Sequence, residues 1–179
     1  VARAKAAPGA LNYSSPGAGT KSHLTAEQLK LRAGIDMVHI PYKSTQDATN
    51  DLLAGRSHAT IVPNVGAMPF QKDTRIRLLG VTSPKRSSFL PDVPAVAEDL
   101  PGYVFESWFG LLAPAKTPRP LIERINAEVA KLLRNPAILE RLAAQGVEPR
   151  PLSVPQFEKL LRDDYAAMAK VAKAVGKVE

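Results

Sequence analysis

Predicted strands and helices alternate between residues 11 and 82, and this alternation constrains the fold more than any other feature of the sequence. Strands are predicted at 11–14, 37–40, 58–62 and 77–82, with helices at 22–33 and 45–54 between the first three. Gly34 and Gly55 follow these two helices, where a glycine commonly ends a helix. Strands that are joined through helices favour a mainly parallel sheet, so we expect an α/β fold.

The composition changes after Ser83. Prolines at positions 84, 91, 94 and 101 interrupt the next segment, and no long element is expected there. An extended run follows at 103–112, and then helices at 118–134, 136–145 and 154–175 with a short strand at 146–150. Thr117 is expected to cap the first of these helices and Ser153 the last. We place a domain boundary near 103–108, because the part after it has too few strands for a complete domain.

The composition also argues against several kinds of chemistry. The chain has no cysteine, which rules out disulfides and thiolate metal ligands. The net charge is +7, but the lysines and arginines are scattered without interleaved aromatic residues, so nucleic-acid binding is not expected. The three histidines lack metal-ligand spacing and no G-x-S-x-G segment is present. We therefore expect no metal site, no cofactor and no catalytic residue.

A loop rich in turn residues, 15–20, lies between the first predicted strand and the first predicted helix. Its sequence, Ser-Pro-Gly-Ala-Gly-Thr, offers backbone N–H groups and two hydroxyls beside the positive end of a helix dipole. These features are typical of an anion-binding loop. The spacing fits neither a Walker loop nor a dinucleotide-binding fingerprint. A tight turn with a helix cap accounts for the same residues equally well.

A second loop, residues 41–45, joins the second predicted strand to the second predicted helix. In a parallel sheet both loops lie at the carboxyl ends of their strands, where open α/β folds bind ligands. Two such loops at one edge favour a binding site there more than either loop does alone. Capping of the helix by Ser44 is the alternative interpretation.

The only tryptophan, Trp108, is close in sequence to Phe105 and Phe109. Aromatic residues grouped in this way either line a ligand slot or pack in a core between domains. We favour the core.

Segments in order through almost the whole chain resemble the solute receptors of tripartite tricarboxylate transporters, the Bug family. The matching segments are YSSPGAGT at 13–20 with His23-Leu24, HIPYK at 39–43, DLLAG at 51–55, GVTS at 80–83 with Arg86, LPDVP at 90–94 with Glu98, PGY at 101–103, WFGL at 108–111 and Ala113-Pro114. Each segment is weak evidence by itself, but their order and spacing together are specific.

The resemblance implies a periplasmic-binding-protein-like fold, in which two α/β domains close on a cleft like a Venus flytrap. Residues 1–104 then form the complete second, ligand-binding domain. Residues 105–179 form the crossover strand and the C-terminal part of the first domain. The opening third of a mature receptor is expected to be missing, and an export signal is expected upstream, because residues 1–10 lack the apolar core of a signal peptide.

The function that the resemblance implies is capture of a small carboxylate, a di- or tricarboxylate or an aromatic acid, in the periplasm for the subunits of a membrane transporter. A receptor that feeds a sensor kinase and, less favoured, an enzyme of the doubly wound class are the alternatives. No catalysis is expected. Because the helices after Trp108 carry apolar faces whose partner strands are expected to be missing, a homodimer is also expected.

The resemblance assigns ligand binding to residues of the two loops and their neighbours. They are Ser15, Gly17, Ala18, Gly19, Thr20, His23, Tyr42, Lys43, Ser44 and Asn64. His23 is expected to support the loop, and Ser44 stands where the family usually has glycine. Val62-Pro63 stands where many members carry Asp-Asn, which leaves Asn64 as the nearest polar group and argues against ligands with an ammonium group.

Overall fold

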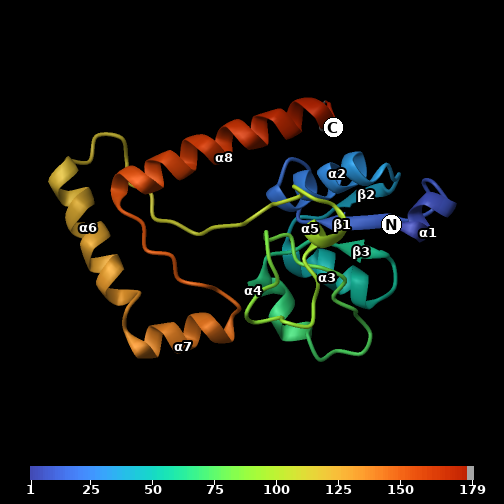
Figure 1. Cartoon of the computed structure of the whole chain (residues 1–179), viewed down its shortest axis with the longest axis horizontal. Helices are drawn as coiled ribbons and strands as arrows, with labels where there is room; N and C mark the ends of the chain where they lie inside the picture. The colour runs from blue at the N-terminus through green and yellow to red at the C-terminus, as the bar shows by residue number, and fades with distance from the viewer. Residues whose placement is uncertain (177–179) are drawn as a thin grey trace. The chain divides into compact units, whose positions relative to one another are not determined.

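The computed structural model describes residues 1–176, and the chain forms two compact units (Figure 1). The first unit consists of residues 1–107 together with the end of the chain from Val171, and the second of residues 108–170. Elements of the first unit are α1 (Ala2–Ala6), β1 (Asn12–Ser15), α2 (Lys21–Ala33), β2 (Val38–Pro41), α3 (Thr45–Leu53), β3 (Ala59–Thr60), α4 (Asn64–Ala67), η1 (Met68–Phe70) and α5 (Val96–Asp99). The division of the chain into receptor domains at residue 104 stays a prediction.

The first unit is built on a parallel sheet with the strand order β2-β1-β3. Tyr13 in the central strand pairs with His39 of β2 and with Ala59 of β3. The predicted alternation of strands and helices therefore folds as expected up to Thr60. Gly34 ends α2 with a φ of 61°, and Ser44 caps α3, both as predicted.

The central strand β1 is polar and yet buried. Its side chains alternate between the two faces of the sheet. The Tyr13 hydroxyl donates to Glu27 Oε1 of α2 at 2.7 Å, whereas the Ser14 hydroxyl on the other face donates to the Ala48 carbonyl of α3 at 3.1 Å. Helices α2 and α3 thus cover opposite faces of the sheet, and β1 meets the rule that buried polar groups are hydrogen-bonded.

The strand predicted at 77–82 is reduced to a single bridge in the described part of the chain. Val81 pairs with Ala95, donating to the Pro94 carbonyl at 2.9 Å and accepting from Val96 at 2.9 Å. Proline has no N–H, so the ladder cannot continue through Pro94. Val81 packs with Leu90 and Ala95 in a small apolar cluster of its own.

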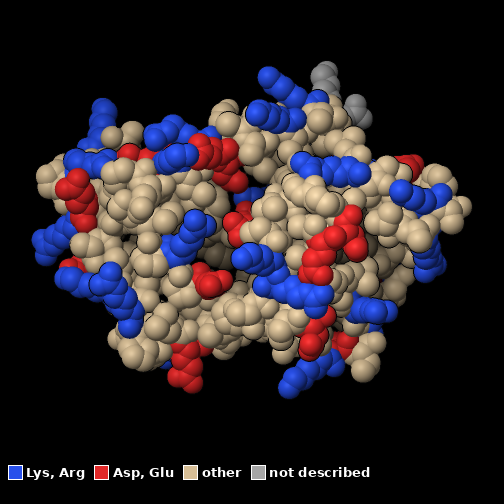
Figure 2. All heavy atoms as spheres, viewed as in Figure 1, with Lys and Arg blue, Asp and Glu red and all other residues tan. Residues whose placement is uncertain are grey.

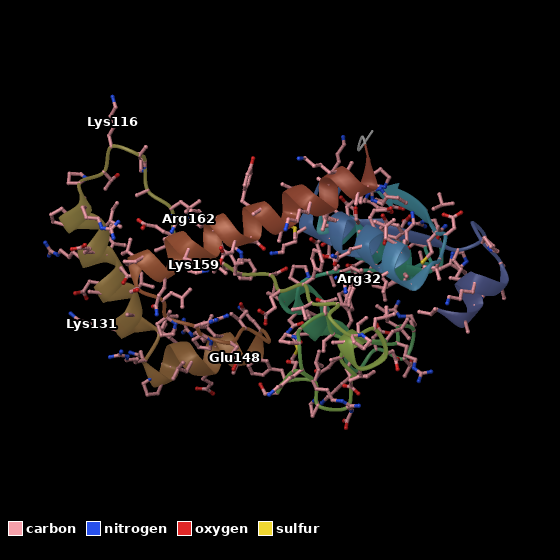
Figure 3. The ribbon with its side chains drawn as sticks, turned by 45° about the horizontal axis from the view of Figure 1, so that its top comes forward. Arg32, Lys116, Lys131, Glu148, Lys159 and Arg162 are labelled. Atoms are coloured by element: carbon pink, nitrogen blue, oxygen red, sulfur yellow. The ribbon has the colours of Figure 1, made fainter. Side chains whose placement is uncertain are left out.

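The second unit contains α6 (Arg119–Leu132), α7 (Pro136–Ala144) and most of α8 (Val154–Val175). Ser153 caps α8 as predicted, because its hydroxyl accepts from Gln156 N–H and Gln156 Oε1 accepts from Ser153 N–H. The cap predicted at Thr117 is wrong: Pro118 precedes the first helical residue of α6 and no side chain caps it. In Figure 3, Lys116 extends away from the ribbon just before this helix.

Two further predicted strands are wrong, because residues 103–112 and 146–150 are irregular throughout in the described chain. The prediction that Phe105, Trp108 and Phe109 pack together in one core is also wrong. Phe105 is buried beside Tyr103, Trp108 packs edge-on against Phe157 at 5.4 Å between ring centres, and Phe109 is exposed. Each of these elements needed a partner distant in sequence, which local patterns do not reveal.

The surface carries basic and acidic side chains that are interspersed on the face shown in Figure 2. This distribution matches the scatter of lysine and arginine in the sequence. None of the helices within residues 1–176 combines the length and the apolar character needed to cross a membrane.

Candidate ligand-binding site

The loop at residues 15–20 connects β1 to α2 and is folded tightly onto itself. The Thr20 hydroxyl donates to the Gly17 carbonyl at 2.7 Å and accepts from His23 N–H at 3.4 Å, which caps α2. Thr20 N–H also donates to the Gly17 carbonyl, at 3.3 Å. At the start of the loop, Gly17 N–H donates to the Ser15 hydroxyl at 3.2 Å. The tight turn with a helix cap is therefore present, and ligand binding by the same loop stays a prediction.

Two glycines of the loop have left-handed φ values, 138° at Gly17 and 75° at Gly19. A Cβ atom at Gly17 would lie 3.3 Å from the carbonyl oxygen of Tyr42, whereas one at Gly19 would meet no atom within 4 Å. Gly17 is thus required both for its backbone conformation and for the close approach of the second loop. At Gly19 only the left-handed backbone conformation favours glycine.

The second loop, residues 41–45, lies against the first. Tyr42 N–H donates to the Ser15 carbonyl at 2.9 Å, and the Tyr42 hydroxyl donates to Asp51, which also binds Arg56. Lys43 is exposed. The two loops share the edge of the sheet where β1 and β2 end, which is the arrangement expected from the sequence.

The predicted site residues Ser44 and Asn64 both lie at the start of a helix. Ser44 caps α3, accepting from Asp47 N–H at 3.1 Å and donating to the Asp47 carboxylate at 2.7 Å. Asn64 is the first residue of α4, after the carboxyl end of β3. Because β3 pairs with β1, Asn64 follows a strand that ends at the same edge of the sheet as the two loops.

The loop already uses most of its backbone donors. Gly17 and Thr20 donate within the loop, and Gly19 N–H donates to His23 Nδ1 at 3.2 Å. Within the described residues, the N–H groups of Ala18 and Ser22 have no hydrogen-bond partner. Sequence reasoning did not place Ser22 in the site. Its N–H, two residues after the Thr20 cap at a position where a helix N–H has no intrahelical partner, makes it a further candidate for the site.

Beneath the loop, three aromatic rings are stacked in the order Tyr13, His39, His23. The ring centres of His39 and His23 are 4.1 Å apart, and those of Tyr13 and His39 are 4.9 Å apart. His39 Nε2 lies 2.7 Å from the Ser15 hydroxyl. His39 was not among the predicted site residues, because only the pairing of β2 with β1 brings it beside Tyr13.

Burial keeps both histidines neutral at pH 7. Burial, together with nearby His23, lowers the pKa of His39 to about 4, and burial also lowers the pKa of His23. Burial by itself would raise the pKa of Glu27, but hydrogen bonds from Lys30 and Tyr13 outweigh it and lower that pKa. The same surroundings raise the pKa of the Tyr13 hydroxyl above its usual range. The rings therefore add no positive charge to the loop at neutral pH.

The site lacks the features of a catalytic or metal centre. The Ser15–His39 pair has the geometry of a nucleophile and base, but Ser15 is 0% exposed and cannot reach a substrate. Among residues 1–176, no group of three or more histidine, aspartate or glutamate side chains is placed to hold a metal ion.

Several solved structures are similar to this chain. Rpa4515 of R. palustris with adipate is 32% identical, with a TM-score of 0.90 over 98% of this chain and 59% of its own. The periplasmic binding protein BugD is 26% identical, with a TM-score of 0.87 over 99% and 60%. MatC of Rhodopseudomonas palustris with bound malate is 26% identical, with a TM-score of 0.83 over 95% and 58%. These structures confirm the expected fold and show that this chain covers only part of it.

Sequence comparison gives the same result. The UPF0065 protein of the tcbD–tcbE intergenic region in a Pseudomonas species is 39% identical over 79% of this chain and 43% of its own length. BugT of Bordetella pertussis is 31% identical over 98% of this chain and 54% of its own. The chain thus spans about half the length of these relatives. The family model that matches residues 1–177 describes receptors, not enzymes, so the chain belongs to the tripartite tricarboxylate transporter family receptors.

Proposed function

We propose that this chain forms one wall of a carboxylate-binding site in a periplasmic solute receptor. The observation that carries the proposal is the joining of two strand-to-helix loops by the 2.9 Å bond from Tyr42 N–H to the Ser15 carbonyl. At this edge the N-termini of α2 and α3 present N–H groups and helix dipoles, which favour an anion. Lys43 adds a positive charge beside them.

The ligands of two related structures guide the choice of solute. Rpa4515 contains adipate and MatC contains malate, and both ligands are dicarboxylates. A dicarboxylate therefore comes first for this chain, and an aromatic acid second. Delivery to transporter membrane subunits from the periplasm is the role that the family description supports.

We further propose that the solute lacks an ammonium group. Such a group needs an acidic partner, and Ile61, Val62 and Pro63, which follow β3, are all apolar. The acids near the loops are already engaged: Asp47 accepts from Ser44, and Asp51 accepts from Tyr42 and Arg56. No carboxylate of the two loops is thus available to an amino acid.

Calorimetric titration of the 179-residue chain with adipate, malate and aspartate tests this function. We expect adipate or malate to bind more tightly than aspartate, which has the same four-carbon dicarboxylate skeleton as malate but carries an amino group. Native mass spectrometry of protein purified without refolding identifies any retained solute. Binding of aspartate above malate would contradict the ligand class, and no binding of any carboxylate would contradict the site.

A further inference from the structure

We propose that His23 and His39 are positioning residues that hold the 15–20 loop from beneath, His23 by accepting from Gly19 and His39 by bonding to Ser15. The ligand role of the loop rests on the function proposed above, whereas the positioning itself is a property of the loop. Neither ring is assigned contact with the solute.

The hydrogen bonds made by His39 and His23 lie at opposite ends of the loop. His39 Nε2 lies 2.7 Å from the hydroxyl of Ser15, the last residue of β1. Gly19 N–H donates to His23 Nδ1 at 3.2 Å, just before the Thr20 cap. The Ser15 hydroxyl in turn accepts from Gly17 N–H. Three of the backbone positions in the loop are therefore fixed, directly or through Ser15, by the stacked histidines.

The bond to Gly19 sets the protonation of His23. A backbone N–H can only donate, so Nδ1 must carry no proton, and the proton of the neutral ring lies on Nε2. A second proton on His23 would place an N–H against the Gly19 N–H and break the bond. His39 is less restricted, because its Nε2 can donate to Ser15 in either protonation state.

The surroundings favour the neutral rings. The titratable and charged groups that face them are Tyr13 from β1, Glu27 and Lys30 from α2, and each other. Glu27 is occupied by the Tyr13 hydroxyl and by Lys30 Nζ at 2.8 Å. Its charge is thus largely compensated, and burial decides the outcome by lowering the pKa of both histidines.

Two substitutions separate positioning from simple packing. His23→Phe keeps a flat ring in the stack but removes the acceptor for Gly19. His23→Asn removes the ring but keeps an acceptor oxygen close to the place of Nδ1. If the His23 ring only fills space, phenylalanine should preserve the loop better than asparagine. If the ring holds the loop through its hydrogen bond, asparagine should preserve it better than phenylalanine.

Amide hydrogen exchange of Gly19, followed by NMR in the 179-residue chain, measures the loop directly. For His23→Phe we expect exchange at Gly19 to rise about three- to tenfold, the effect of losing one hydrogen bond, and His23→Asn to restore most of the protection. The Tyr42 amide, which donates to Ser15, is the internal reference for an intact sheet edge. Protonation of His23 in acid, at a pH below the ordinary histidine value because burial lowers its pKa, should reduce wild-type protection at Gly19 but not that of His23→Asn.

Affinity for adipate and malate, measured on the same proteins, should follow the exchange. Unchanged exchange at Gly19 in His23→Phe would overturn the proposal, as would loss of protection at both Gly19 and Tyr42 in both variants, since that indicates packing alone. If exchange responds as expected but the wild type binds no carboxylate, the positioning stands and the proposed function fails. If the wild type binds a carboxylate but His23→Phe changes neither exchange nor affinity, the proposed function stands and the positioning role fails.

Discussion

The two units of this chain differ in which residues they bury: the first buries polar side chains, and the second exposes large apolar ones. In the first unit, Ser14 and Ser15 of the central strand are 0% exposed and bonded to their neighbours. In the second, Phe109, Leu111 and Leu112 are 72%, 69% and 74% exposed, and α6 and α7, which lie wholly in the described chain, contain no buried residue. Burial here follows the availability of packing partners more than residue type.

This contrast predicts different sensitivities to mutation. Ser14→Val places a methyl group against the buried Ala48 of α3 and removes the donor to the Ala48 carbonyl. We expect a loss of about 3 kcal/mol in the free energy of unfolding, measured in urea. Leu112→Ser in the second unit should change it by less than about 0.5 kcal/mol. Equal effects would show that Leu112 is buried in solution.

The exposed apolar residues of the second unit predict self-association. We expect the chain to be dimeric or larger at tens of micromolar by light scattering. The double change Leu111→Glu and Leu112→Glu should weaken association by about 2 kcal/mol or more, since each buried leucine contributes on that scale. Lys116→Glu, an exposed residue nearby, is the control for charge. A clean monomer with a cooperative melt would contradict the prediction.

Acid should destabilise the first unit before the second. His39 has a folded pKa of about 4 and an ordinary value of 6.5, so the unfolded chain takes up a proton first as the pH falls. Stability is then complete above pH 6.5 and declines towards pH 4, by about 2 kcal/mol after allowance for partial solvent access. Amide exchange in β1 reports this loss, and fluorescence of Trp108 reports the second unit. Simultaneous loss of both signals would show that the units unfold together.

The smallest predicted effect is a change in carboxylate affinity caused by substitution of Gly19. Gly19→Asp should weaken carboxylate binding about tenfold, because it adds a negative charge beside the loop. Gly19→Asn is the matched control: it has nearly the same size, tolerates the left-handed φ of 75° and carries no charge. Calorimetry with adipate or malate gives the comparison. Equal affinities of the two variants would remove Gly19 from the site.

The sequence predicts those parts of the fold that depend on local chemistry. The Gly34 terminator and the caps at Ser44 and Ser153 are signals contained within a few residues, and all three are present. The strands predicted at 77–82, 103–112 and 146–150 do not form because a strand needs a partner distant in sequence; within residues 1–176, Val81 pairs with Ala95 alone.

The candidate site shows the same limit. Its two loops follow from the alternation of strands and helices, since parallel strands end at one edge. Two contacts of the site depend on side-chain directions and on strand register: the hydrogen bond from Gly19 N–H to His23, and the contact between His39 and Ser15. The spacing of residues along the chain predicts neither contact.

The bond between Tyr42 and Ser15 has a consequence for how such a receptor evolves new specificity. Because Gly17 lies close to the Tyr42 carbonyl, a side chain at Gly17 would displace the second loop and so carry a cost to both. Ala18 is free of this coupling: it is exposed, and its N–H has no partner in the described chain. If the loops bind solute as proposed, variation in solute range among relatives should therefore accumulate first at Ala18, where a new side chain changes the proposed site without displacing the second loop.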